Sequence, residues 1–263
     1  MKIRKYNGCG NDFIILPFED DRDNSELAKK LCQEFSTDGM ILVKEKPIEM
    51  VFYNQDGTEA PMCGNGIRTF ARYLVDQDLV ASDCNNFDVI TQAGIMRINI
   101  ISRQPFLVEV NMGQAEFASE KTKMTVEDTG FHQINISGNL LDLHTVFIGT
   151  IHTVVFVDDT LAMTSQDLGE VICNLPLFSQ KTNVNFLEII DRKNIKVKTY
   201  ERGVGWTLAC GTGCCGSVYI GQKEGLLDDE VCVHLEKGSL TISNRGDIFM
   251  TGPAEFEMER DII

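Results

Sequence analysis

The sequence has 263 residues, 43% hydrophobic and 24% charged, which is typical of a folded globular protein and not of a disordered, collagen-like or coiled-coil chain. Its 24 Lys and Arg against 39 Asp and Glu residues give a net charge of −15, which argues against nucleic acid or an anionic membrane as partner. Nine irregularly spaced cysteines, and no apolar segment long enough to span a bilayer, favour a reduced, cytoplasmic, soluble protein.

Short strands and a few helices are predicted along the chain. The first helix is expected at residues 25–31, with Ser25 as its N-cap, and the second at residues 67–74, where apolar side chains recur at helical spacing. A third, wholly buried helix is expected at residues 214–220. Strands are predicted at residues 13–16, 106–110, 154–157, 195–197 and 231–235, which are apolar or alternating and are bounded by turn residues.

The chain contains two copies of one plan. The Cys-Gly-Asn-Gly of residues 63–66 is repeated as the Cys-Gly-Thr-Gly of residues 210–213, each ten residues after a tyrosine, Tyr53 or Tyr200. Two further matches follow in the same order, residues 94–98 with 238–242 and residues 113–117 with 252–256. We therefore expect an α+β fold of two pseudo-symmetric, homologous domains, 1–117 and 118–263. Each is expected to be a curved β-sheet around a central helix, with the active site in the cleft between them.

Each Cys-Gly-x-Gly segment directly precedes a predicted apolar helix. The first amides of a helix have no intrahelical acceptor and favour a bound anion such as a carboxylate. The same amides favour a thiolate, so we expect the pKa of Cys63 and of Cys210 to be lowered. Two such cysteines on opposite sides of one ligand could remove a proton and return another, and so invert a stereocentre. The other cysteines are expected to be small buried side chains: Cys9, Cys32, Cys84, Cys173, Cys214, Cys215 and Cys232. A zinc site is not expected, because the chain has no Cys-x-x-Cys pair.

Several motifs resemble those of the diaminopimelate epimerase family from the first residues to Phe256. They are residues 6–13 (Tyr-Asn-Gly-Cys-Gly-Asn-Asp-Phe), 54–59, 62–68, 182–184, 200–203 and 209–213. The resemblance implies two pseudo-symmetric halves with a closing cleft, and inversion of an amino acid without pyridoxal phosphate, other cofactor or metal. It implies that Cys63 and Cys210 are the catalytic base and acid.

The resemblance also implies a set of substrate-binding residues. The amides of Gly64, Asn65, Gly211 and Thr212 would bind the substrate carboxylate, and Glu201 and His152 would hold the α-amino group. Asn11, Asn54, Asn183 and Arg202 would hold the rest of the substrate. The alternative is that the asparagines are turn residues and that Arg202 forms a surface ion pair.

Two positions depart from the family pattern. The family usually has Gly-Asn-Pro-His where this chain has Gly-Thr-Ile-His at residues 149–152, and it usually has glutamate at the position of Trp206. Thr150 offers fewer hydrogen bonds than an asparagine, and Trp206 brings a large aromatic face to the expected distal pocket.

Three functions therefore stay open. By family, the chain would convert LL- to meso-diaminopimelate with the two thiols. Alternatively, it would racemise another amino acid such as histidine, or bind an amino acid without catalysis. In each case the expected partner is a small-molecule amino acid, not nucleic acid or membrane, and a homodimer is left open.

Overall fold

The computed structural model describes residues 1–117, 119–125, 131–136, 139–161 and 167–262. The chain forms two compact units: unit 1 contains Met1–Asn111 and Thr251–Ile263, and unit 2 contains Met112–Met250. The expected boundary lay after residue 117, whereas the chain leaves unit 1 at residue 111 and returns to it at residue 251. The return was not visible in the sequence because it depends on pairing between the two ends of the chain, Lys2 opposite Asp261. Residue 118, at the expected boundary, lies outside the described residues.

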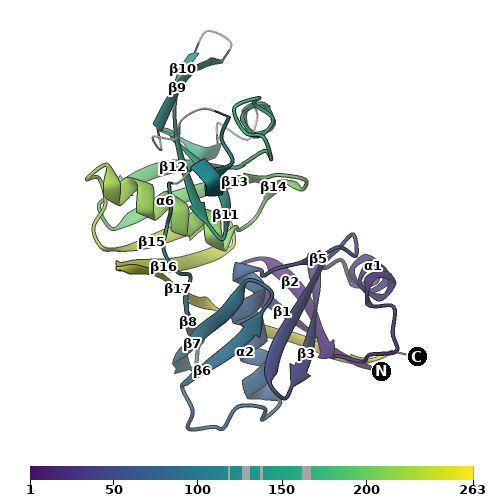
Figure 1. The fold of residues 1–263 in the computed structure, drawn as a ribbon. Helices are drawn as coiled ribbons and strands as arrows, with labels where there is room; N and C mark the ends of the chain where they lie inside the picture. The colour runs from purple at the N-terminus through teal and green to yellow at the C-terminus, as the bar shows by residue number, and fades with distance from the viewer. Residues whose placement is uncertain (118, 126–130, 137–138, 162–166, 263) are drawn as a thin grey trace. The chain divides into compact units, whose positions relative to one another are not determined.

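Unit 1 is mostly sheet with two helices (Figure 1). Its strands are β1 (Lys2–Gly8), β2 (Asn11–Pro17), β3 (Gly39–Glu45), β4 (Ile48–Asn54), β5 (Glu59–Ala60), β6 (Asn86–Thr91), β7 (Gly94–Arg103), β8 (Phe106–Asn111) and β18 (Glu255–Asp261). Its helices are α1 (Asn24–Phe35) and α2 (Gly64–Asp76). Helix α2 contacts β1, β2, β4, β8 and β18, so the strands surround it as the sequence predicted.

Unit 2 is also mostly sheet with a few helices, and β17 (Asp247–Pro253) carries the chain from it back into unit 1. Its strands are β9 (Phe131–Ile136), β10 (Asn139–Ile148), β11 (Thr150–Phe156), β12 (Asn183–Asp191), β13 (Asn194–Glu201), β14 (Gly205–Thr207), β15 (Glu230–Leu235) and β16 (Gly238–Arg245). Its helices are α3 (Ser119–Thr122), α5 (Leu168–Cys173) and α6 (Gly211–Lys223). Helix α6 contacts β10, β11, β12, β13 and β16.

The strand pairings confirm that the two units follow one plan. In unit 1, β2 pairs parallel with β3, β3 antiparallel with β4, β4 parallel with β6, and β6 antiparallel with β7. In unit 2, β11–β12, β12–β13, β13–β15 and β15–β16 repeat this order of parallel and antiparallel pairs. A short hairpin precedes the central helix each time, β4–β5 before α2 and β13–β14 before α6. The α+β fold and the internal repeat are therefore confirmed.

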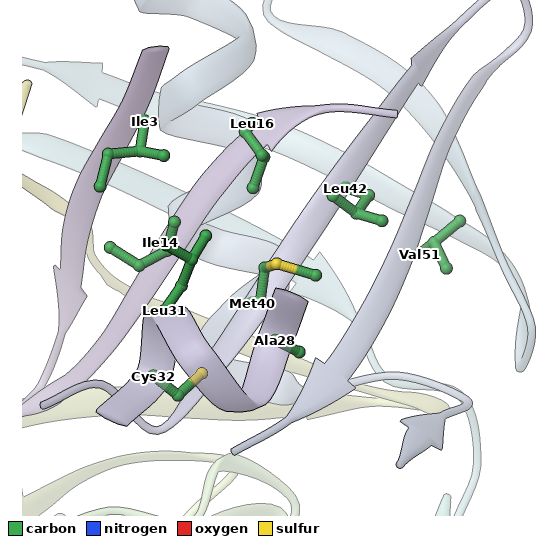
Figure 2. Packing of buried hydrophobic residues seen from close by; sticks show 9 residues of the cluster. All are labelled: Ile3, Ile14, Leu16, Ala28, Leu31, Cys32, Met40, Leu42 and Val51. Carbon is green, nitrogen blue, oxygen red and sulfur yellow. The ribbon is translucent and has the colours of Figure 1, made fainter. Parts of the chain in front are cut away.

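Helix α1 covers the hydrophobic core of unit 1. Ala28, Leu31 and Cys32 point from α1 towards strands β1 to β4, as Figure 2 shows. The expected N-cap, Ser25, is wrong. The carboxylate of Asp23 accepts the Glu26 amide at 3.1 Å, while the Ser25 hydroxyl donates to the Gly57 carbonyl at 2.8 Å. Both residue types cap helices well, and the observed N-cap lies two residues before the expected one. Within the described residues, no helix is long and apolar enough to cross a membrane.

Candidate active site

Cys63 is the N-cap of α2, the central helix of unit 1. Its backbone is extended, with φ −129°, and the Ile67 amide donates to its carbonyl at 2.8 Å to begin the helix. The Gly66 amide donates to the Cys63 sulfur at 3.4 Å. A Cβ at Gly66 would lie 3.2 Å from the Cys63 Cβ and from Ile41, so the glycine allows this close turn. The half-buried sulfur thus lies at the positive end of a helix.

Asn11 and Asn65 lie together beside this helix terminus. The Asn65 side-chain amide donates to Asn11 Oδ1, and Asn65 Oδ1 accepts from Arg68 at 3.0 Å. Arg68 is fully buried and also donates to the carbonyls of Gly64 and Pro253. The sequence did not single out Arg68, although a cation on an apolar helix face was the available signal. These bonds fix the first turn of α2.

Asn54 is the last residue of β4, where the turn to β5 begins. Its side chain donates to the Thr58 hydroxyl at 3.0 Å, and its backbone amide donates to the Thr58 carbonyl at 2.9 Å. These contacts match the alternative in which Asn54 is a turn residue.

Cys210 holds the equivalent position at α6 in unit 2. It is the N-cap, with φ −124°, and the Cys214 amide donates to its carbonyl at 2.9 Å. Its thiol differs from the expectation, because burial and then the nearby Glu201 carboxylate raise its pKa well above the usual value. The Thr212 hydroxyl and the Gly213 amide act in the opposite direction but do not compensate. The sequence showed the helix terminus but not the burial of the sulfur, which is the larger effect.

Glu201 is the last residue of β13, and Arg202 follows it; both extend this half-site. The Thr207 hydroxyl donates to Glu201 Oε1 at 2.7 Å and fixes the carboxylate. Arg202 donates to the Thr150 hydroxyl at 3.2 Å and to the Gln180 carbonyl at 2.9 Å. It forms no surface ion pair among the salt bridges of the described residues.

Asn183 and Thr150 hold the Arg202 segment in place. Asn183 is buried at the start of β12, and its Oδ1 accepts the Arg202 backbone amide at 3.0 Å. Thr150, one of the two departures from the family pattern, accepts from the Arg202 guanidinium. The threonine therefore still holds the arginine, although it offers only a hydroxyl.

His152 is buried in β11, next to the middle of α6. Its side chain is fully excluded from solvent, and a Cβ at Gly216 would lie 3.5 Å from the His152 Cβ. Burial and then the Arg202 charge lower the pKa of His152 from 6.5 to about 3. The ring is therefore neutral near pH 7. Its Nδ1 lies 3.1 Å from Nδ2 of Asn185, a residue that the sequence reasoning missed. An asparagine between the apolar residues Val184 and Phe186 was the signal.

Trp206, the second departure from the family pattern, packs against two aromatic rings of unit 2. The ring is half-buried in β14 and packs at 5.6 Å from the Phe186 ring and at 5.5 Å from the Tyr200 ring, which it meets edge-on. Both partners belong to the hydrophobic core of unit 2 or pack against it. These contacts pack the half-buried tryptophan against the core of unit 2.

The structure thus places most of the expected residues in two half-sites, whereas Asn54 and Trp206 belong to neither. One, at the start of α2, contains Cys63, Gly64, Asn65 and Asn11; the other, around the start of α6, contains Cys210, Gly211, Thr212, His152, Asn183, Glu201 and Arg202. Among the described residues, no group of three or more His, Cys, Asp or Glu side chains is placed to hold a metal ion.

Comparison with known proteins agrees with this geometry. The family model "Diaminopimelate epimerase" matches residues 3–118 and 144–257. Diaminopimelate epimerase of Halothermothrix orenii is 41% identical over 272 residues, covering 97% of this chain and 95% of the relative. That of Alkaliphilus metalliredigens is 36% identical with the same coverage.

Solved structures of lower identity share the fold. A predicted epimerase of Pseudomonas aeruginosa has a TM-score of 0.73 at 14% identity, covering 100% of this chain and 99% of its own. A probable proline racemase of Agrobacterium radiobacter has a TM-score of 0.72 at 12% identity, covering 100% of this chain and 92% of its own. With two equivalent Cys-Gly-x-Gly helix termini and relatives of 36–41% identity along nearly its whole length, the chain belongs to the diaminopimelate epimerase family.

Proposed function

We propose that this protein is a diaminopimelate epimerase, an isomerase that interconverts LL- and meso-diaminopimelate by inverting one α-carbon. One observation carries the proposal: a cysteine is the N-cap of the central helix in each of two equivalent units. A protein that only bound an amino acid would need the helix termini but not the two thiols. The isomerase class follows from the family.

The chemistry needs one thiolate and one thiol on opposite faces of the α-carbon. The thiolate takes the α-proton, the Cα–H electron pair is left as a carbanion, and the thiol gives its proton to the other face. The products are the inverted amino acid and the opposite thiol–thiolate pair, so atoms and charge balance. Because burial and Glu201 raise the pKa of Cys210, Cys210 would be the protonated thiol before LL-diaminopimelate reacts, and Cys63 would act as the base.

The first amides of α2 and α6 would stabilise the negative charge that develops on the substrate carboxylate. These amides, from Gly64, Asn65, Gly211 and Thr212, come without an intrahelical acceptor and need no rearrangement during the reaction. Glu201, fixed by Thr207, offers a carboxylate to the α-ammonium group. Loss of ammonium charge would raise the barrier to Cα deprotonation, so this contact supports the reaction.

Diaminopimelate is favoured over histidine by two contacts. The aromatic face of Trp206, the reason to consider an imidazole substrate, packs on Phe186 and Tyr200 instead. Arg202 is held by Thr150 and Gln180, which leaves a guanidinium suited to a distal carboxylate that histidine lacks.

The test is a stereochemical assay on purified protein without added pyridoxal phosphate. LL-diaminopimelate and L-histidine are supplied separately, and the isomers are separated by chiral chromatography. We expect meso-diaminopimelate to form, with kcat/KM at least about 100-fold above that for histidine, equivalent to about 2.7 kcal/mol of transition-state binding. Inversion of histidine with the higher kcat/KM would overturn the choice of substrate. Binding of diaminopimelate without any inversion would favour the amino-acid binder.

Two half-buried cysteines outside the half-sites provide matched controls. Cys84 lies before β6 in unit 1, and Cys232 lies in β15 of unit 2. Their serine variants should keep wild-type turnover, whereas Cys63→Ser and Cys210→Ser should each lose nearly all inversion.

Nine cysteines also favour a reducing compartment, and we propose that the enzyme acts in the cytoplasm.

A further inference from the structure

A buried polar network lies beneath His152 in unit 2. His152 is in β11, Asn185 is in the adjacent strand β12, and Thr199 of β13 is directly opposite Asn185. His152 and Asn185 are fully buried and Thr199 is 3% exposed. Asn185 also lies against α6, because a Cβ at Gly213 would be 2.2 Å from Asn185 Oδ1. The network therefore connects the imidazole to the helix that begins at Cys210.

The two ends of the Asn185 side chain are distinguished by their partners. Nδ2 is 3.4 Å from the Thr153 carbonyl oxygen, which can only accept a hydrogen bond. Oδ1 accepts from the Thr199 hydroxyl at 3.0 Å. The atom that lies 3.1 Å from His152 Nδ1 is the same Nδ2, so it is a donor.

This polarity determines the tautomer of His152. Because Nδ1 accepts a hydrogen bond, the single proton of the neutral ring is on Nε2. Burial and the Arg202 charge oppose a second proton, in agreement with this neutral form. Nε2 is itself buried and has no hydrogen-bond partner among the described residues. A buried N–H without an acceptor is unfavourable, so a ligand acceptor placed there would be bound.

We infer that Asn185 is a positioning residue that holds His152 as the neutral Nε2–H tautomer, so that His152 donates a hydrogen bond to an acceptor atom of the bound amino acid. An Nε2–H cannot accept from an ammonium group. His152 therefore does not hold the α-ammonium as the family resemblance implied, and that group is left to the Glu201 carboxylate. A carboxylate oxygen of the amino acid is the acceptor of matching charge. The substrate contact rests on the proposed function, whereas the tautomer does not.

The tautomer can be measured directly by long-range ¹H–¹⁵N correlation spectra of protein labelled in histidine nitrogen. The chain has four histidines, and His152→Gln identifies the His152 signals by their loss. At pH 7 we expect the wild-type His152 to show a protonated Nε2 and an unprotonated Nδ1. A proton on Nδ1 in the wild type would overturn the inference.

Two variants test the role of Asn185. Asn185→Asp puts an acceptor where the amide donated, and the Nδ1 of His152 should become protonated. Thr199→Val removes the donor that fixes the amide and should give a mixture of tautomers, whereas Thr199→Ser keeps the hydroxyl and should restore the Nε2–H form. An unchanged His152 spectrum in both Asn185→Asp and Thr199→Val would overturn the inference. Thermal melting identifies a variant that has not folded; in that case the His152 spectrum of the other, folded variant tests the inference.

Turnover gives a second readout. Asn185→Asp should lower kcat by about tenfold or more, with Thr199→Ser within about twofold of wild type. If the wild type shows the expected tautomer but inverts no diaminopimelate, the proposed function fails and the inference about Asn185 stands. If diaminopimelate is inverted but Nδ1 carries the proton, the inference fails and the proposed function stands.

Discussion

Acidification should destabilise unit 2 through His152. The pKa of this fully buried ring is lowered from 6.5 to about 3, so between these values the unfolded chain binds a proton that the folded protein does not. Stability attributable to this group is therefore complete above pH 6.5 and is lost as the pH falls. Each pH unit in this window is worth about 1.36 kcal/mol, which gives a loss of about 2 kcal/mol between pH 7 and pH 5.

The assay is urea unfolding at pH 7 and pH 5, followed by tryptophan fluorescence. Trp206 is the single tryptophan of the chain and packs in the core of unit 2, so its signal reports on the correct unit. The loss of stability on acidification should be about 2 kcal/mol smaller in His152→Gln than in the wild type. The wild type must be compared with this variant because burial also lowers the pKa of His144, so His144 too destabilises the folded protein as the pH falls.

The control is a histidine on the surface of the same unit. His234 lies exposed in β15, and His234→Gln should show the same loss between pH 7 and pH 5 as the wild type. The reasoning would be refuted by equal losses in the wild type and in His152→Gln.

Four further variants have defined outcomes. Cys63→Ser and Cys210→Ser each keep one thiol, so each should eliminate HCl from one enantiomer of a β-chloro substrate analogue; the preferences should be opposite, and identical preferences would show that the wrong pair is assigned. Gly213→Ala would place a Cβ only 2.2 Å from Asn185 Oδ1, so the Tm and kcat should both be reduced; wild-type values would contradict this packing. Asp23→Ala removes the N-cap of α1 and should lower the free energy of unfolding of unit 1 by about 1 kcal/mol in urea; an unchanged midpoint would show that Asp23 does not cap the helix.

Local features of this chain were predictable from its sequence. Both central helices begin at the expected Cys-Gly-x-Gly segments, because glycine permits the tight turn and a regular apolar spacing follows. The internal repeat also predicted two halves of one plan, and the strand pairings of the two units agree with it. What failed depended on contacts between distant segments. The return of β18 to β1, the burial of the Cys210 sulfur and the packing of Trp206 on Phe186 are all of this kind.

The candidate site divides in the same way. Within a motif, the sequence indicated which residues share a region: Glu201, the last residue of β13, lies near Cys210, and Arg202 follows it and is held by Asn183. Asn185 was missed because its role depends on His152 and Thr199, which come from strands β11 and β13 on either side of β12. No sequence spacing indicates which end of an amide faces an imidazole, and that orientation decides which hydrogen bond the imidazole can make.

The central claim is that two different thiols exchange protons with the two faces of one α-carbon. It is tested most directly by converting LL-diaminopimelate in heavy water and examining the meso product of the earliest turnovers by mass spectrometry and NMR. Because Cys63 would remove the proton and Cys210 would supply another, every product molecule should carry solvent deuterium at the inverted α-carbon, and unconverted substrate should carry much less. Early product that retains the original hydrogen at that carbon would mean that a single group moves the proton, and would contradict the account.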